Sequence, residues 1–205
     1  MLGFKEKIMP LRRLRVVCHG HPALQRVSLP IKTVSEELRQ LARRMIITMR
    51  ENDVVGVGLA APQVGVNVRL ITIDTYFERR STAELSPGEI LLNPRMPLAL
   101  INPEILSCSE DCASAEEGCL SLPGVSGQVS RPARVLLKAA DLDGEQFQVE
   151  CGGLLARCLQ HEIDHLDGKL FYEHLSKDEQ KAAVNTMRNL ARREQALLQK
   201  QPPAQ

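Results

Sequence analysis

Hydrophobic residues recur at helical spacing in three segments of the chain. In residues 35–50, apolar side chains three or four positions apart alternate with arginines, which predicts an amphipathic helix capped by Ser35. A second 3–4 pattern runs through residues 154–167, directly after two glycines. A third helix is predicted to begin at Ser176, because Ser176 and Glu179 have the spacing of a capping box.

Strand patterns lie between these helices. Residues 66–74 alternate in β-branched side chains and predict a strand. Residues 133–140 and 146–150 flank an Asp-Gly turn, which predicts a β-hairpin. Residues 75–97 contain prolines, glycine and charged side chains, and are expected to form a long surface loop. The order of helix, strand, hairpin, helix and helix predicts an α+β fold.

Composition narrows the class of protein. The 205 residues, 43% hydrophobic and 25% charged, are typical of one soluble globular domain. A net charge of +1 argues against a protein that coats nucleic acid, and four Phe, two Tyr and no Trp argue against a base-stacking platform. Apolar runs such as 98–101 are far shorter than the roughly 20 residues of a membrane span.

The N-terminal residues lack the apolar core of a secretory signal, so a cytoplasmic location is expected. The six cysteines are expected to be mostly reduced thiols, because a chain of this length does not need disulfides. Cys18, Cys151 and Cys158 are interpreted as small buried side chains. Cys108 and Cys112 are a weak candidate for metal binding, since no matching second pair exists.

The strongest chemical signal is His161-Glu162-Ile163-Asp164-His165, within the second predicted helix. Residues four apart on a helix advance about 400°, so His161 and His165 lie one turn apart on one face and can bind the same metal ion. Glu162 lies beside that face, where its carboxylate can handle a proton of metal-bound water. The alternative is two ordinary histidines on an amphipathic helix.

Two histidines leave a catalytic metal site incomplete, because such sites usually have three protein ligands. The downstream residues are similar to the metzincin extension, but Phe171 stands where that family has its third histidine. Glu173 and His174 follow nearby, and Cys119 stands upstream in a Glu-Gly-Cys-Leu-Ser segment. The third ligand must come from outside the His-Glu-x-x-His segment.

Residues 56–63 combine two glycines with small side chains, which would let the backbone of a ligand approach closely. No Lys-Ser or Lys-Thr pair follows, so this segment is not a P-loop. The amide of Gln63 can donate a hydrogen bond to a developing oxyanion, although a lone glutamine is more often an ordinary surface or turn residue.

Together the three segments resemble the peptide deformylase family. The chain has Gly-x-Gly-Leu-Ala-Ala-x-Gln at 56–63, Glu-Gly-Cys-Leu-Ser at 117–121 and Gln-His-Glu-x-Asp-His-Leu at 160–166, in the order of that family. The similarity covers roughly residues 16–175. It implies an α+β fold with antiparallel sheets around a central metal-binding helix, flanked by an N-terminal and a C-terminal helix.

The resemblance also implies the role of individual residues. The implied metal ligands are Cys119, His161 and His165. The implied catalytic groups are Glu162, as general acid/base, and two oxyanion donors, Gln63 and the backbone N–H of Leu120. The implied substrate-binding residues are Val57 and Gly58 in the peptide groove and Leu154 and Cys158 in the methionine pocket.

The implied reaction is hydrolysis that removes the formyl group from the N-terminal formyl-methionine of newly synthesised polypeptides, with metal-bound water as nucleophile. One divalent ion per chain is expected, Fe²⁺ first, with Zn²⁺, Ni²⁺ or Co²⁺ as substitutes; thiolate and imidazole ligands by themselves suit zinc or iron. The expected partners are N-formyl-methionyl nascent peptides and, through the C-terminal helix, the ribosome. Neither membrane binding nor sequence-specific nucleic-acid binding is expected, and the location implied is a bacterial-type cytoplasm.

Residues 1–175 are expected to form a single catalytic domain, 176–198 the C-terminal helix and 199–205 a disordered tail. The segment from 176 to 205 has six basic and three acidic residues, a small excess that bears on docking to the ribosome. Residues 76–97 form a longer stretch than in compact relatives and are interpreted as a variable surface loop.

One departure from the family pattern concerns the loop after Cys119. Many relatives have an arginine in a Pro-Gly-x-Arg-Gly pattern, whereas this chain has Ser126 at that place. The difference predicts weaker anchoring of the peptide backbone or the first side chain, with Arg131 or Arg157 as candidates for compensation.

Two other functions compete with this one. A His-Glu-x-x-His metallopeptidase would need a downstream third ligand, and Phe171 and the Cys119 segment argue against it. A ribosome-associated module or inactive homologue is disfavoured by the intact candidate ligands and Glu162.

Overall fold

The computed structural model describes residues 11–52, 54, 56–76 and 84–200. A five-stranded antiparallel sheet with the order β1-β2-β3-β6-β7 is its largest element. Its strands are β1 (Gly58–Ala60), β2 (Leu70–Ile73), β3 (Leu98–Cys108), β6 (Arg134–Ala140) and β7 (Gln146–Gly152). A second sheet pairs β4 (Cys112–Gly118) with β5 (Ser126–Pro132).

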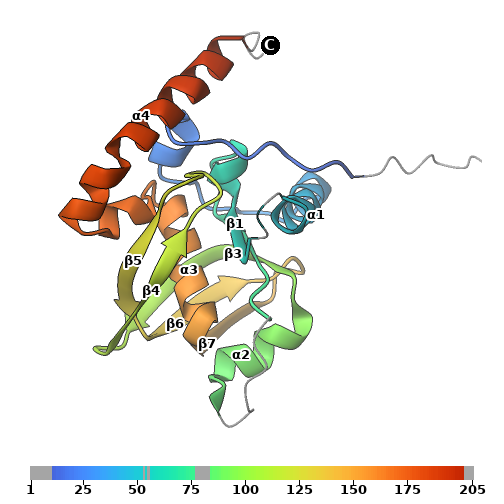
Figure 1. Ribbon diagram of the computed structural model, residues 1–205. Helices are drawn as coiled ribbons and strands as arrows, with labels where there is room; N and C mark the ends of the chain where they lie inside the picture. Colours follow the sequence, from blue (N-terminus) through green and yellow to red (C-terminus); the bar gives the residue numbers. More distant parts are fainter. Residues whose placement is uncertain (1–10, 53, 55, 77–83, 201–205) are drawn as a thin grey trace, which may run out of the picture.

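Helix α3 (Gly153–Leu166) lies between the two sheets, and α1 (Glu36–Arg50) covers the other face of the larger one (Figure 1). Alternation along β2 explains this arrangement, because successive side chains of a strand point to opposite faces. Ile71 and Ile73 pack in the core cluster of α3, whereas Leu70 packs in the cluster that contains residues of α1. The predicted α+β fold with antiparallel sheets around a central helix is confirmed.

The three predicted helices are present. The Ser35 hydroxyl accepts a hydrogen bond from Leu38 N at 3.3 Å and caps α1. Ser176 and Glu179 form the predicted capping box at the start of α4 (Lys177–Lys200). Helix α4 ends two residues later than predicted, so residues 199 and 200 are helical; the rest of the predicted tail, 201–205, lies outside the described residues.

The β-hairpin of β6 and β7 is confirmed, but the strand predicted over 66–74 is shorter. Only Leu70–Ile73 joins the sheet. The preceding residues pair instead with the segment around Leu29: Leu29 N donates to Asn67 O at 3.0 Å, and Arg69 N donates to Leu29 O at 2.9 Å. The alternating pattern therefore marks extended backbone, of which only residues 70–73 belong to the sheet.

The prediction of a surface loop over 75–97 is wrong in its second half. Helix α2 (Pro87–Leu92) follows Ser86, and Ser86 forms a capping box with Glu89. The Ser86 hydroxyl also accepts a hydrogen bond from Gly152 N at 2.8 Å, which ties α2 to the end of β7. Residues 77–83 of the predicted loop lie outside the described residues.

Helix α4 closes the core on the side of the small sheet. Met187 and Leu190 are each 7% exposed and pack in a cluster with Leu122 and Phe171. Further along α4, the buried carboxylate of Glu194 forms an ion pair with Arg15 near the start of the chain. Within the described residues, no helix is both long and apolar enough to cross a membrane.

Candidate active site

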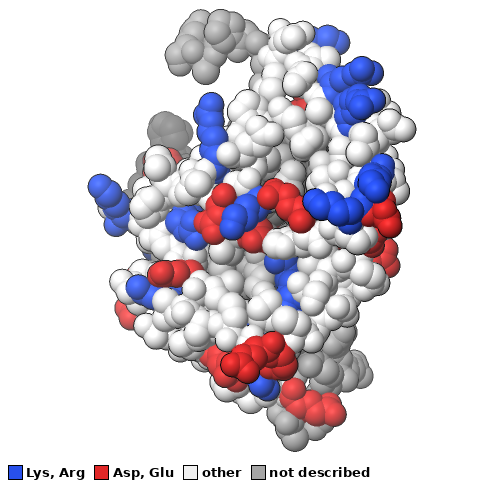
Figure 2. Space-filling model, turned by 90° about the vertical axis from the view of Figure 1, so that its left-hand side faces the viewer, with Lys and Arg blue, Asp and Glu red and all other residues white. Residues whose placement is uncertain are grey.

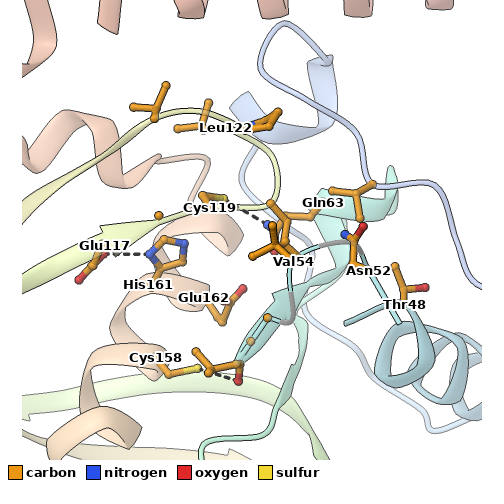
Figure 3. A pocket seen from close by; sticks show the side chains of 18 of the residues that line it. Thr48, Asn52, Val54, Gln63, Glu117, Cys119, Leu122, Cys158, His161 and Glu162 are labelled. Carbon is orange, nitrogen blue, oxygen red and sulfur yellow. Dashed lines mark hydrogen bonds and ion pairs between the residues drawn. The ribbon is translucent and has the colours of Figure 1, made fainter. Parts of the chain in front are cut away.

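The three sequence segments meet in one cleft of about 860 Å³. It lies between β1, the end of β4 and the exposed side of α3 (Figure 3). The residues predicted for catalysis and binding that line it are Val57, Gly58, Gln63, Cys119, Leu120, Leu154, Cys158, His161 and Glu162. His165 is fully buried behind this lining.

Cys119, His161 and His165 form a compact group whose ligand atoms all lie within 4.8 Å of one another. Cys119 directly follows the last residue of β4, and the two histidines lie one turn apart on α3. The distance from Cys119 Sγ to His165 Nε2 is 3.2 Å. One thiol and two imidazoles at this spacing fit a divalent metal ion such as zinc or iron.

The downstream candidates for a third ligand are directed elsewhere. Phe171 stacks on His161 with ring centroids 5.8 Å apart. The residue at the position of the third metzincin ligand therefore packs against a histidine and offers no ligand atom. His174 Nε2 lies 2.9 Å from Asp164 Oδ2, and Glu173 Oε1 accepts a hydrogen bond from Leu170 N. Neither belongs to a group that could hold a metal among the described residues.

All six cysteines are free thiols. Cys108 and Cys112 are exposed, and neither belongs to a metal-binding group in the described part of the chain. Cys151 and Cys158 are buried as predicted, whereas Cys18 is only partly buried. Burial, followed by the charges of Glu89 and Glu150, raises the pKa of Cys151 to about 12, which makes it chemically inert at neutral pH.

Glu117 holds His161 in place, and sequence reasoning assigned it no role. Its Oε2 lies 2.9 Å from His161 Nδ1 (Figure 3), which leaves Nε2 as the ring nitrogen free for the cleft. Arg131 donates two hydrogen bonds to the same carboxylate, from Nε at 2.7 Å and from Nη2 at 3.0 Å. Arg157 donates a third from Nη1 at 2.7 Å.

This network argues against the compensation that was predicted for the missing arginine at Ser126. Arg131 is buried between Glu117 and Asp164, and Arg157 binds Glu117, Val129 O and Ala113 O, so both guanidinium groups are occupied. The hydroxyl of Ser126 itself donates to Glu116 Oε1 at 2.7 Å.

The charge of Glu117 is stable inside the protein. Burial alone would raise the pKa of Glu117, but the hydrogen bonds from His161 and Arg131 and the positive charge of Arg131 outweigh it and hold the pKa well below its usual range. The carboxylate is therefore an acceptor at every working pH. It belongs to the Glu-Gly-Cys-Leu-Ser segment, and its position directly before that glycine and cysteine is the signal that could have identified it.

Glu162 is 4% exposed, and its Oε2 has no hydrogen-bond partner among the described residues. Burial is the main reason that the pKa of Glu162 is raised to about 7. Gly58 lies directly against it, since a Cβ on Gly58 would overlap Glu162 Oε1 and lie 2.8 Å from Cys158 Sγ. The side chain of Glu162 thus points into the cleft beside the metal-binding group (Figure 3).

The two predicted oxyanion donors, Gln63 and the Leu120 N–H, both lie next to Cys119. Gln63 is buried, and its Nε2 donates to Cys119 Sγ at 3.4 Å and to Ser121 Oγ at 3.3 Å, while its Oε1 accepts from Ala60 N. The Leu120 N–H has no acceptor in the described part of the chain. The Leu120 N–H can therefore donate to a ligand oxygen directly, whereas the Gln63 amide would first have to release Cys119 or Ser121.

The predicted methionine pocket lies against α3. Cys158 is buried, and its Sγ donates to Val57 O at 3.4 Å. Burial, followed by the charges of Glu162 and Glu117, raises the pKa of Cys158 well above its ordinary value, so the thiol is neutral. Leu154 adds an apolar side chain one turn earlier, so these two residues contribute an uncharged surface to the cleft.

Most of the chain matches a known protein family. The family model described as polypeptide deformylase matches residues 13–181. The chain belongs to the peptide deformylase family. A peptide deformylase of Phenylobacterium zucineum is 42% identical over 184 residues, which cover 90% of this chain and 99% of the relative.

Solved deformylases have the same fold. The structure from Plasmodium falciparum superposes with a TM-score of 0.76 at 31% identity, over 89% of this chain and 98% of that one. The deformylase from Legionella pneumophila gives a TM-score of 0.72 at 36% identity, over 93% of this chain and 99% of that one. The family match includes all three segments of the cleft and ends early in α4.

Proposed function

We propose that this protein is a metal-dependent peptide deformylase, which removes the formyl group from the N-terminus of newly synthesised polypeptides by hydrolysis. The observation that carries the proposal is the convergence of Cys119, His161 and His165 beside the buried, unpartnered carboxylate oxygen of Glu162. The match to the deformylase family over residues 13–181 supports the same reaction.

Cys119, His161 and His165 would hold the metal ion. A divalent ion bound there would supply Lewis acidity, which would polarise a carbonyl oxygen and lower the pKa of a water molecule at neutral pH. We propose Fe²⁺ as the native ion, with Zn²⁺, Ni²⁺ and Co²⁺ as substitutes, because membership of the deformylase family implies it; one thiolate and two imidazoles by themselves suit zinc or iron. Glu117 would fix the tautomer of His161 through the hydrogen bond at Nδ1.

Glu162 would act as the general acid/base. Its Oε2 has no competing partner in the described residues, so it is free to take a proton from the attacking water and return it to the departing amine nitrogen. Gly58 leaves room for this carboxylate, because any larger residue would displace it.

Gln63 and the Leu120 N–H would bind the formyl oxygen as negative charge develops on it. The backbone at Val57 and Gly58 would line the peptide groove, and Leu154 and Cys158 would contact the methionine side chain. The neutral, buried thiol of Cys158 supports this last assignment, because a charged group there would oppose an apolar side chain.

Metal content and formate release together test the proposal. The protein, purified without oxygen and supplied with Fe²⁺, is expected to hold one ion per chain and to release formate from formyl-Met-Ala-Ser. Cys119→Ala should lose most of the metal content and most of the formate release. Cys112→Ala changes an exposed thiol outside the metal-binding group and should keep both properties. Equal metal content in Cys119→Ala and the unmodified protein would contradict the ligand assignment.

We further propose that α4 docks on the ribosome in the cytoplasm, close to the nascent substrate. Arg188, Arg192 and Arg193 are exposed on α4. On the face that carries α4, basic side chains predominate in the upper part, acidic and basic side chains alternate across the middle, and acidic ones gather at the lower end (Figure 2). Ribosomal RNA would attract such a basic surface.

Reversing the charge of these three arginines to glutamate tests docking without removing buried residues of α4. The variant should co-sediment with ribosomes several-fold less at low salt while its formate release from free peptides is retained. Unchanged co-sedimentation would contradict docking through this surface.

A further inference from the structure

The cleft extends beyond the residues assigned to metal, proton transfer and methionine. Its far wall is formed by Arg13 to Val16 and by Thr48 and Asn52. Thr48 and Asn52 lie across the cleft from His161 and Cys158 (Figure 3). A volume of about 860 Å³ is near the upper end for ligand sites, so it exceeds what one formyl-methionine needs. The side with Thr48 is therefore left for the residues that follow methionine.

Arg13 belongs to this wall, and hydrogen bonds fix both its side chain and the backbone that follows it. Leu14 N donates to Thr48 Oγ1 at 2.8 Å, and Val17 N donates to Gln63 O at 2.8 Å. Arg13 Nη1 donates to the backbone oxygen of Glu51 at 2.7 Å. The guanidinium is thus positioned at the cleft while remaining exposed to water.

The charge of Arg13 has no carboxylate partner in the described part of the chain. The other two arginines that line the cleft differ: Arg15 pairs with Glu194, and Arg157 pairs with Glu117. Asn52 adds no charge. Among the described residues of this wall, Arg13 therefore supplies a positive charge that no carboxylate compensates, on the side of the cleft away from Glu117 and Glu162.

We propose that Arg13 makes this enzyme favour substrates with an acidic side chain within the three residues that follow formyl-methionine. The inference rests on the proposed deformylase function and names the class of peptide that it acts on best. Arg13 is a specificity-determining residue in this proposal, since it contacts the substrate away from the reacting atoms.

Peptides of the form formyl-Met-Ala-Ala-Ala provide the test, with Asp or Lys placed in turn at the second, third and fourth positions. At one or more positions, kcat/KM for the Asp peptide should exceed that for the Lys peptide by about three- to ten-fold at low salt, as for an exposed ion pair set against a repulsive one. The difference between the Asp and Lys peptides should appear in KM and not in kcat, because Arg13 does not touch the reacting bond. It should shrink in 0.5 M salt, since the charges are exposed.

Arg13→Gln should bring the ratio of Asp to Lys close to one, and Arg13→Glu should invert it. Arg12→Gln is the matched control: Arg12 is also exposed and adjacent, but it does not line the cleft, so the ratio should stay as in the unmodified protein. Using the ratio within each variant removes differences in overall activity between preparations.

Equal ratios in the unmodified protein and Arg13→Gln, with formate released from the all-alanine peptide, would overturn the inference and leave the deformylase function standing. A ratio that falls as far in Arg12→Gln as in Arg13→Gln would also overturn it, because general charge would then be the cause. No formate from any peptide would overturn the proposed function itself, and this inference with it.

Discussion

Glu117 binds His161 on one side and two guanidinium groups on the other, so its charge supports both the histidine and the packing of α3 against β5. Glu117→Gln removes that charge, which leaves Arg131 paired with Asp164 and leaves Arg157 with the backbone oxygens of Val129 and Ala113. Metal affinity should fall about 10- to 100-fold, the usual effect of losing a carboxylate behind a histidine ligand. Competition with a chelator measures it.

Glu116→Gln is the matched control for this prediction. Glu116 is the neighbouring carboxylate on β4, but it is exposed and accepts a hydrogen bond from Ser126 alone among the described residues. Its metal affinity should be unchanged. If both variants lose affinity equally, Glu117 does not act through His161.

Gly58 matters because a Cβ at this position would overlap Glu162 Oε1. Gly58→Ala should therefore displace the Glu162 side chain and lower kcat by at least about ten-fold, while the metal ligands remain in place. Gly56→Ala should lower kcat less, since the added Cβ would lie 3.2 Å from the flexible end of Leu120 and 3.3 Å from Gly58 O, and would not meet Glu162. Steady-state kinetics with a formyl-methionyl peptide separate the two, and equal kcat values would contradict the steric argument.

Side chains whose interaction partners lie only a few positions away along the chain could be predicted from the sequence. His161 and His165 share one helix face, so their proximity follows from spacing alone. Glu117 escaped prediction because its partners come from β5 and α3 and meet only in the folded chain. The same contacts explain why Arg131 and Arg157 could not be recognised as structural residues.

At the level of elements, α2 depends on a cap that also serves the sheet. The Ser86 hydroxyl accepts hydrogen bonds from Glu89 N and Gly152 N, and it donates to Glu89 Oε2. Ser86→Ala should lower the free energy of unfolding by about 1–2 kcal/mol, the usual range for losing an N-cap. Ser86→Thr keeps the hydroxyl and should lose less. Urea unfolding measures both, and equal losses would mean that the hydroxyl is not responsible.

Helices α1, α3 and α4 were predicted because each has an amphipathic 3–4 pattern and, for α1 and α4, a capping residue, whereas the six-residue α2 is too short to show such a pattern. Strands β3 and β4 were missed for two different reasons. Strand β3 contains Pro103 and an Asn102 with a φ of 49°, which interrupt an ordinary strand pattern. Strand β4 is exposed along most of its length, so it lacks the apolar alternation that marks a half-buried strand.

Across the whole molecule, the two ends of the described chain stabilise each other. Gly20 packs so closely on α4 that a Cβ there would lie 2.6 Å from Ala191 Cα, and Arg15 pairs with Glu194. The wall of the cleft that contains Arg13 and Arg15 therefore rests on the C-terminal helix. The sequence predicted α4 as a separate segment, whereas its packing makes it part of the catalytic unit.

The buried face of α4 should therefore contribute to the stability of the whole molecule. Leu190→Ala should lower the free energy of unfolding by about 2–4 kcal/mol, because Leu190 is 7% exposed in the core. Val184→Ala, at a side chain of the same helix that is 40% exposed, should change it by less than about 0.5 kcal/mol. Equal effects in urea unfolding would contradict the packing of α4 described above.

The most direct test of the account compares formate release from formyl-Met-Ala-Ser by the metal-loaded protein and by its Glu162→Gln variant. The substitution keeps the shape of the side chain but removes its ability to take a proton. In Glu162→Gln, kcat should fall about 10²- to 10⁴-fold while one metal ion per chain is still bound. Formate release at the same rate from both proteins would contradict it.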